Sequence, residues 1–132
     1  MSQIRIGNKI VGYKSKLFTI AEIGINHNGS IKIAKKLIDK AKQAGFSAVK
    51  FQTYITNDLV SPNTGLVNYQ KKNRYKDMRT LLQKYNFSFE TFAKLKKYCD
   101  SKKIIFLSTP FDMKSATFLN SINIPIQLIE FI

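Results

Sequence analysis

The sequence has very little of what several protein classes depend on. It contains one cysteine, Cys99, and one histidine, His27, among 132 residues. A single cysteine excludes a disulfide framework within the chain, and one histidine cannot hold a metal ion unaided. No apolar run approaches the roughly 20 residues that cross a membrane, and the first residues lack the apolar segment of a signal peptide. These absences predict a soluble, cytoplasmic protein.

Acidic residues are also scarce, with 8 against 22 basic residues and a formal net charge of +14. A basic surface of this size can bind nucleic acid or anionic lipid. The lysines are spread along the chain, however, and the closest approach to a basic cluster, YQKKNRYK at 69–76, is short. We therefore expect a lysine-rich solvated surface, with neither a nucleic-acid nor a membrane partner. A non-enzymatic basic binding protein stays open as an alternative.

The chain does contain a regular alternation of apolar strands and amphipathic helices. Gly7-Asn8 splits an alternating segment, 4–12, and predicts a two-residue hairpin. A polar stretch from 56 to 77 predicts a long loop, which is commonly functional. Buried strands are predicted at 16–24, 47–54 and 103–111, with a fourth starting at 124–132. Helices are predicted from the N-cap Ser30 to Gly45, at 78–85, after the N-cap Ser88, and at 113–122.

This order predicts an α/β fold with a parallel sheet. Two architectures fit, an open doubly wound sheet and a (β/α)8 barrel. No G-x-G-x-x-G or P-loop follows the first strand, which counts against a nucleotide fold. A barrel takes about 250 residues, so we expect residues 1–132 to form a truncated TIM-barrel domain, its N-terminal half. In that interpretation 1–15 is a short β-hairpin, and 16–132 holds three βα units and the start of a fourth strand.

Polar residues occur where the predicted strands end. Glu22 ends the first, Lys50 and Gln52 end the second, and Thr109 ends the third. Ligands of parallel α/β folds bind at the carboxyl ends of the strands. Lys50 and Gln52 are two residues apart and so point to the same side. A lysine with a threonine suits a phosphate or carboxylate, which predicts an anion-binding enzyme.

Each of these residues also has a purely structural interpretation. Glu22 and Lys50 could form a structural ion pair, and Thr109-Pro110 could be turn chemistry. His27 could be a hydrogen-bonding residue of its loop. Cys99 lies in a helical pattern among lysines and is expected to be an inert thiol.

Four segments resemble the sialic acid synthase family, which includes N-acetylneuraminate synthase and legionaminic acid synthase. They are AEIGINHNGS, AVKFQTY, DLVSPNTGLVNYQKKN and IIFLSTPFD, in the order and spacing of the family. The resemblance runs from about residue 4 to about residue 125.

The resemblance implies a (β/α)8 barrel followed by a small antifreeze-like domain, in a homodimer. Such enzymes condense phosphoenolpyruvate with an N-acylated amino sugar such as N-acetylmannosamine, release phosphate and use a divalent metal, manganese or magnesium. It implies that Glu22 is catalytic, that Lys50 and Thr109 bind phosphoenolpyruvate, and that Gln52 and Asn73 bind the sugar. Another phosphoenolpyruvate-dependent aldol-type synthase remains an alternative.

The chain departs from the family pattern after Ile126. The family has a second lysine on the fourth strand, in a segment resembling YKIxSGE, where this chain reads QLIEFI. The later strands with the metal-binding histidines are absent, as is the antifreeze-like domain. We therefore expect an inactive fragment without metal ligands, and a frameshift or truncated gene is one hypothesis for its origin.

Overall fold

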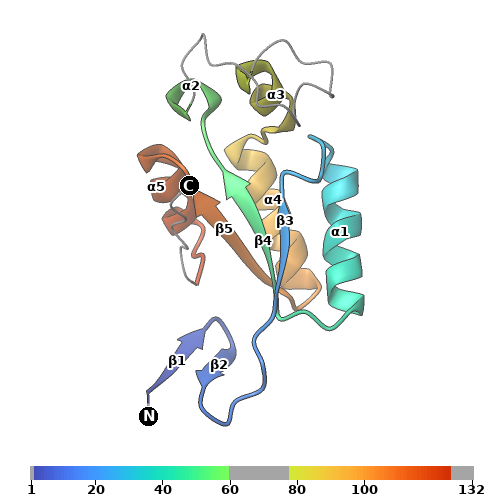
Figure 1. Ribbon diagram of the computed structural model, residues 1–132, viewed down its shortest axis with the longest axis vertical. Coiled ribbons are helices and arrows are strands. Elements are labelled where there is room, and N and C mark those ends of the chain that lie inside the picture. Colours follow the sequence, from blue (N-terminus) through green and yellow to red (C-terminus); the bar gives the residue numbers. More distant parts are fainter. Residues whose placement is uncertain (1, 60–77, 126–132) are drawn as a thin grey trace.

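The computed structural model describes residues 2–59 and 78–125 (Figure 1). Its strands are β1 (Gln3–Ile6), β2 (Lys9–Gly12), β3 (Ile20–Gly24), β4 (Ala48–Thr53) and β5 (Ile105–Pro110). Its helices are α1 (Ile31–Gln43), α2 (Thr56–Leu59), α3 (Met78–Tyr85), α4 (Phe89–Ser101) and α5 (Met113–Ser121). The predicted alternation of strands and helices is confirmed over these residues.

The predicted hairpin is confirmed. β1 and β2 pair antiparallel, with Ile6 opposite Lys9 and the Gly7-Asn8 turn between them. Figure 1 shows this hairpin at the end of the molecule where β3 and β4 begin, opposite to α2 and α3. The hairpin therefore lies away from the strand ends at which ligands of parallel sheets bind.

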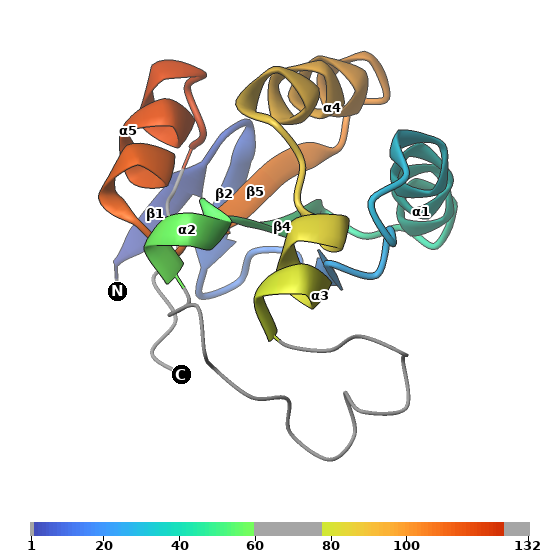
Figure 2. The same ribbon diagram turned by 90° about the horizontal axis from the view of Figure 1, so that it is seen from above.

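β3, β4 and β5 form a parallel sheet in the order in which they occur along the chain. Helices α1, α4 and α5 all cover the same face of this sheet, as Figure 2 shows. A doubly wound sheet carries helices on both faces, whereas a barrel carries them on the outer face alone. Within the described residues, the arrangement is a parallel α/β sheet with its three long helices on one face, which differs from a doubly wound sheet.

The first long helix forms where its sequence signals place it. The Ser30 hydroxyl accepts the backbone N–H of Ile33 and caps α1. The buried residues Ala34, Ile38 and Ala41 recur at helical spacing and turn one face toward the sheet. Ser88 caps α4 in the same way, through the N–H of Thr91.

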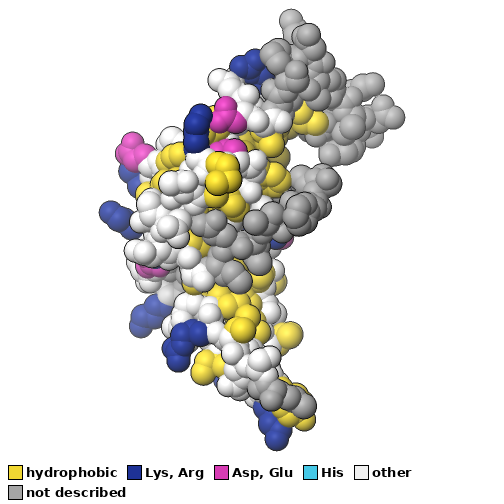
Figure 3. Space-filling model, turned by 90° about the vertical axis from the view of Figure 1, so that its left-hand side faces the viewer, with side chains coloured by type: hydrophobic (Ala, Val, Ile, Leu, Met, Phe, Trp, Pro, Cys, Tyr) yellow, Lys and Arg dark blue, Asp and Glu magenta, His cyan; other side chains and the backbone are white. Residues whose placement is uncertain are grey.

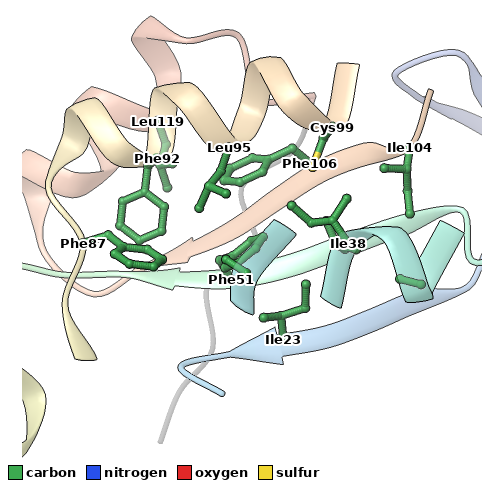
Figure 4. Packing of buried hydrophobic residues seen from close by; sticks show 13 residues of the cluster. Ile23, Ile38, Phe51, Phe87, Phe92, Leu95, Cys99, Ile104, Phe106 and Leu119 are labelled. Carbon is green, nitrogen blue, oxygen red and sulfur yellow. The ribbon is translucent and has the colours of Figure 1, made fainter. Parts of the chain in front are cut away.

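A cluster of aromatic and aliphatic side chains fills the space between the sheet and the helices (Figure 4). Phe51 of β4 stacks on Phe106 of β5 with ring centroids 5.3 Å apart, and it meets Phe92 of α4 edge-on at 6.4 Å. Each such buried phenylalanine contributes about 1.5–3 kcal/mol. Because Phe51 faces the helices, the alternation of the strand turns Lys50 and Gln52 to the opposite face.

The prediction of a strand at 16–24 that is buried on both faces is wrong. β3 begins only at Ile20, and of its residues only Ile23 and Gly24 are buried. Its sole partner in the described sheet is β4, so it is an edge strand there. The apolar run at its start indicated burial, but burial depends on a neighbouring strand, which a run of letters does not reveal.

Other boundaries differ as well. The predicted loop at 56–77 starts with a helical turn, α2, and residues 60–77 lie outside the described residues. β5 starts at Ile105 rather than 103, because residues 102 and 103 form the turn that follows α4, with Lys103 at φ 55°. Ile124 and Pro125 are not in a strand, and the rest of the predicted fourth strand, 126–132, is outside the described residues.

On one face of the molecule, the described basic side chains are spread out and form no cluster. On the face shown in Figure 3, lysine and arginine side chains lie at intervals along the whole molecule, with acidic side chains among them. This agrees with a solvated lysine-rich surface. None of the described helices combines the length and the apolar character needed to cross a bilayer.

Candidate functional site

The predicted polar residues meet at the carboxyl ends of the three parallel strands. The register places Glu22 of β3 opposite Lys50 of β4, and Gln52 of β4 opposite Thr109 of β5. All four lie on one side of the sheet by strand alternation, opposite to the side that the helices cover. The sequence therefore identified a real cluster, which we call the strand-end site and define as Glu22, Lys50, Gln52 and Thr109.

Lys50 and Glu22 form an ion pair, with Lys50 Nζ 2.8 Å from Glu22 Oε2. The lysine side chain is only 11% exposed, whereas the glutamate side chain is 51% exposed. A buried ammonium needs a compensating charge, so the structural interpretation of the pair is confirmed. The exposed carboxylate still has acceptor positions that a ligand can use.

Gln52 reaches the same place from two residues further along β4. A methyl group added to Gly24 would lie 3.6 Å from Glu22 Oε1 and 3.7 Å from Gln52 Nε2. The glutamate oxygen and the glutamine amide therefore approach the same point of the β3 backbone. An ammonium, a carboxylate and an amide thus gather at neighbouring strand ends.

Thr109 is completely buried, and its hydroxyl has no hydrogen-bond partner within residues 2–59 and 78–125. Burying an unpaired hydroxyl costs about 1–3 kcal/mol. The neighbouring Thr53 shows the usual solution, because its hydroxyl lies 2.7 Å from that of Ser108. A buried hydroxyl without a partner among the described residues, on the same side of the sheet as Lys50, is an arrangement that a bound anion would complete.

His27 makes the expected hydrogen bond within its loop and is also part of the core. Its Nδ1 accepts the N–H of Gly29 at 3.1 Å, so the expected loop hydrogen bond is present. The ring is also buried and stacked on Phe87, with centroids 4.0 Å apart. Burial lowers the pKa of His27 to about 4. The sequence indicated a polar loop residue, whereas the imidazole is part of the core beneath the loop.

The structure describes Cys99 but not Asn73, and it bears on the expected metal ligands. Asn73 lies outside the described residues. Cys99 is buried, and desolvation raises the pKa of its thiol to about 12, which agrees with an inert thiol. No three histidine, cysteine or acidic side chains converge anywhere in the described part of the chain to form a metal site. The strand-end site offers one carboxylate, already paired with an ammonium, which does not fit a divalent metal.

One residue near the site escaped the sequence analysis. Asp112 follows β5, caps α5, and accepts three hydrogen bonds, one of them from the backbone of Ile55 beyond β4. An aspartate directly before a helical pattern is a recognisable N-cap signal. The bond to Ile55 joins residues 57 positions apart and has no signal in the sequence.

The NeuB family model matches residues 37–130. The chain belongs to the NeuB family. This match covers well over half of the sequence and confirms the resemblance to sialic acid synthases. Curated relatives of the chain include acid synthases, which are enzymes.

Individual NeuB relatives agree with this assignment. N,N'-diacetyllegionaminic acid synthase of Legionella pneumophila is 38% identical over 120 residues, covering 89% of this chain and 34% of that protein. Spore coat polysaccharide biosynthesis protein SpsE of Bacillus subtilis is 40% identical over 123 residues, covering 92% and 32%. The chain therefore spans about a third of the length of these curated relatives.

A solved NeuB-type structure has the same fold. The N-acetylneuraminic acid synthetase of Leptospira borgpetersenii, crystallised with citrate, superposes with a TM-score of 0.81 at 31% identity. The match covers 97% of this chain and 41% of that chain. The α/β arrangement described above is thus the arrangement of a known synthase.

Proposed function

We propose that this chain supplies the first βα units of a (β/α)8-barrel synthase that makes a nonulosonic acid. The reaction condenses phosphoenolpyruvate with an N-acylated amino sugar such as N-acetylmannosamine and releases phosphate. The observation that carries the proposal is the strand-end site, in which the Lys50 ammonium pairs with a half-exposed carboxylate. On the same side of the sheet, one strand further along, the buried Thr109 hydroxyl has no hydrogen-bond partner among the described residues. The intact enzyme is proposed to be a cytoplasmic homodimer.

The proposed roles follow from the charges of the reactants. Phosphoenolpyruvate carries a phosphate and a carboxylate, so the Lys50 ammonium and the Thr109 hydroxyl would hold it. Its methylene carbon attacks the sugar aldehyde, forming the new carbon–carbon bond. Positive charge then develops at the former enol carbon until water adds there and phosphate leaves. The Glu22 carboxylate would stabilise that charge.

The sugar needs neutral hydrogen-bonding groups rather than charges. Gln52, whose amide lies near Glu22, and Asn73 are proposed to bind its hydroxyl and N-acyl groups. The manganese or magnesium ion implied by the family would take its ligands from another part of the intact enzyme. The strand-end site, whose one carboxylate is already paired with an ammonium, does not fit a divalent metal.

Two threonines of neighbouring strands provide the test. Thr109→Val replaces an unpaired buried hydroxyl by a methyl group of similar size, so we expect unchanged or slightly higher stability. If Thr109 donates to the phosphate or carboxylate, its removal should weaken phosphoenolpyruvate binding about tenfold or more, since a hydrogen bond to a charged group contributes about 1.5–3 kcal/mol. Isothermal titration calorimetry and urea unfolding measure the two effects.

Thr53→Val is the matched control. It removes a hydroxyl that is hydrogen-bonded to Ser108 on the helix-covered face, so we expect a loss of about 1–3 kcal/mol in stability with unchanged binding. The proposal is contradicted if the two variants weaken binding equally, or if the unmodified chain does not bind phosphoenolpyruvate at all.

A further inference from the structure

Asp112 links three parts of the structure through one carboxylate. Its Oδ1 accepts the backbone N–H of Ser115 at 2.7 Å, which caps α5. Its Oδ2 accepts the Ser115 hydroxyl at 2.7 Å and the backbone N–H of Ile55 at 2.8 Å. The side chain is half-buried, so these bonds are partly shielded from competing water.

The link to Ile55 lies just beyond the strand-end site. Ile55 follows Gln52 by three residues, and Asp112 follows Thr109 by three residues. The ladder between β4 and β5 ends at the pair of Thr53 and Pro110, followed by a bond from the Phe111 N–H to the Thr53 carbonyl. Past that point the backbone of β5 turns into α5, and the Asp112 carboxylate supplies the acceptor that Ile55 needs.

Capping alone does not require this arrangement. Ser30 and Ser88 cap α1 and α4 with a single hydroxyl. A serine at 112 would cap α5 equally well, but its single hydroxyl oxygen would leave no second oxygen to accept the Ile55 N–H. The second carboxylate oxygen of the aspartate therefore serves to link the segments that follow β4 and β5.

We propose that Asp112 is a positioning residue, which holds the ends of β4 and β5 at the spacing that brings Gln52 and Thr109 together. Its effect on ligand binding rests on the proposed function, whereas its effect on the strand ends does not. Asp112 contacts no reacting atom in this account. It acts through the backbone of Ile55.

The test compares Asp112→Asn and Asp112→Ser with the unmodified chain. The asparagine side chain has one acceptor oxygen, so it can accept the N–H of Ser115 or that of Ile55, but not both. Asparagine is a good N-cap, so we expect it to keep the bond from Ser115 and to lose the bond from Ile55. We expect amide hydrogen exchange at Ile55, followed by NMR, to accelerate at least tenfold in both variants. We expect the dissociation constant of phosphoenolpyruvate to rise at least fivefold.

Ser88→Ala is the control, because it removes a helix cap of the same kind from α4. It should lower overall stability without a selective change at Ile55 or in phosphoenolpyruvate affinity. Exchange changes confined to the amides of α5, together with unchanged affinity in the Asp112 variants, would overturn the proposal. If the unmodified chain binds no phosphoenolpyruvate, the proposed function fails, and exchange at Ile55 still decides whether Asp112 holds the strand ends.

Discussion

The Glu22–Lys50 pair is at once a structural and a chemical feature. The sequence left two interpretations open, an ion pair and an anion site, and the geometry accommodates both. The lysine is buried and needs a negative charge nearby, while the carboxylate stays half in solvent. Glu22 can therefore stabilise the buried Lys50 and remain accessible to a ligand, because Glu22 is far more exposed than Lys50.

The buried His27 predicts a specific pH dependence. Its pKa is lowered from 6.5 to about 4 because burial penalises the charged form. The folded value lies below the unfolded one, so the contribution to stability is complete above about pH 6.5 and is lost as the pH falls toward 4. Because the chain has a single histidine, NMR of the imidazole Hε1 reports it directly.

We expect this resonance to stay at its neutral position at pH 5.5 in the folded protein. The free energy of unfolding of His27→Gln should fall less steeply than that of the wild-type protein as the pH drops from 6.5 to 4, because the variant has no imidazole to protonate. An imidazole that titrates near 6.5 in the folded state would contradict the burial described here.

At the scale of elements, the loop between β3 and α1 is pressed against the end of α3. A methyl group on Gly29 would lie 2.3 Å from the carbonyl oxygen of Lys84, and Gly29 has φ +70°. Both the space and the backbone conformation therefore require glycine. This contact sets the loop that carries His27 against α3, and Phe87, two residues beyond that helix, stacks on the imidazole.

Two glycine substitutions separate the cost of a positive φ from the cost of a steric clash. Gly45 also has a positive φ, +84°, but nothing lies within 4 Å of an added methyl group. Gly45→Ala should cost about 1–2 kcal/mol from backbone conformation alone. Gly29→Ala should cost clearly more, because a backbone carbonyl cannot move aside cheaply. Urea unfolding measures both, and equal losses would show that the loop does not press on α3.

At the scale of the whole molecule, the described chain places three proposed substrate-binding groups and the proposed catalytic carboxylate on one sheet, while the strand-end site does not fit a divalent metal. We therefore expect residues 1–132 alone to bind phosphoenolpyruvate without turning it over. The measurement is phosphate release from phosphoenolpyruvate with N-acetylmannosamine and manganese. Turnover that disappears in Glu22→Gln would contradict this expectation and show that these 132 residues suffice.

Much of the architecture was predictable because its signals are local. The N-cap residues Ser30 and Ser88 predicted two helices. Gly7-Asn8 predicted the hairpin, and the apolar segment before Lys50 predicted a central strand. The failures were non-local. The segment before Glu22 looked like a strand buried on both faces, but β3 has a partner on one side alone in the described sheet, and pairing is a property of the assembled fold.

The sequence by itself determined the alternation of the strands and of the longer helices, the family, and the residues of the strand-end site, because propensity, capping and the alternation of a strand act over a few residues. Tertiary structure alone decided that His27 is buried against Phe87, that the Thr109 hydroxyl lacks a partner among the described residues, and that the Ile55 N–H donates to Asp112. Each of these depends on which distant segments become neighbours. That outcome is set by packing across the whole sheet rather than by any short stretch of sequence.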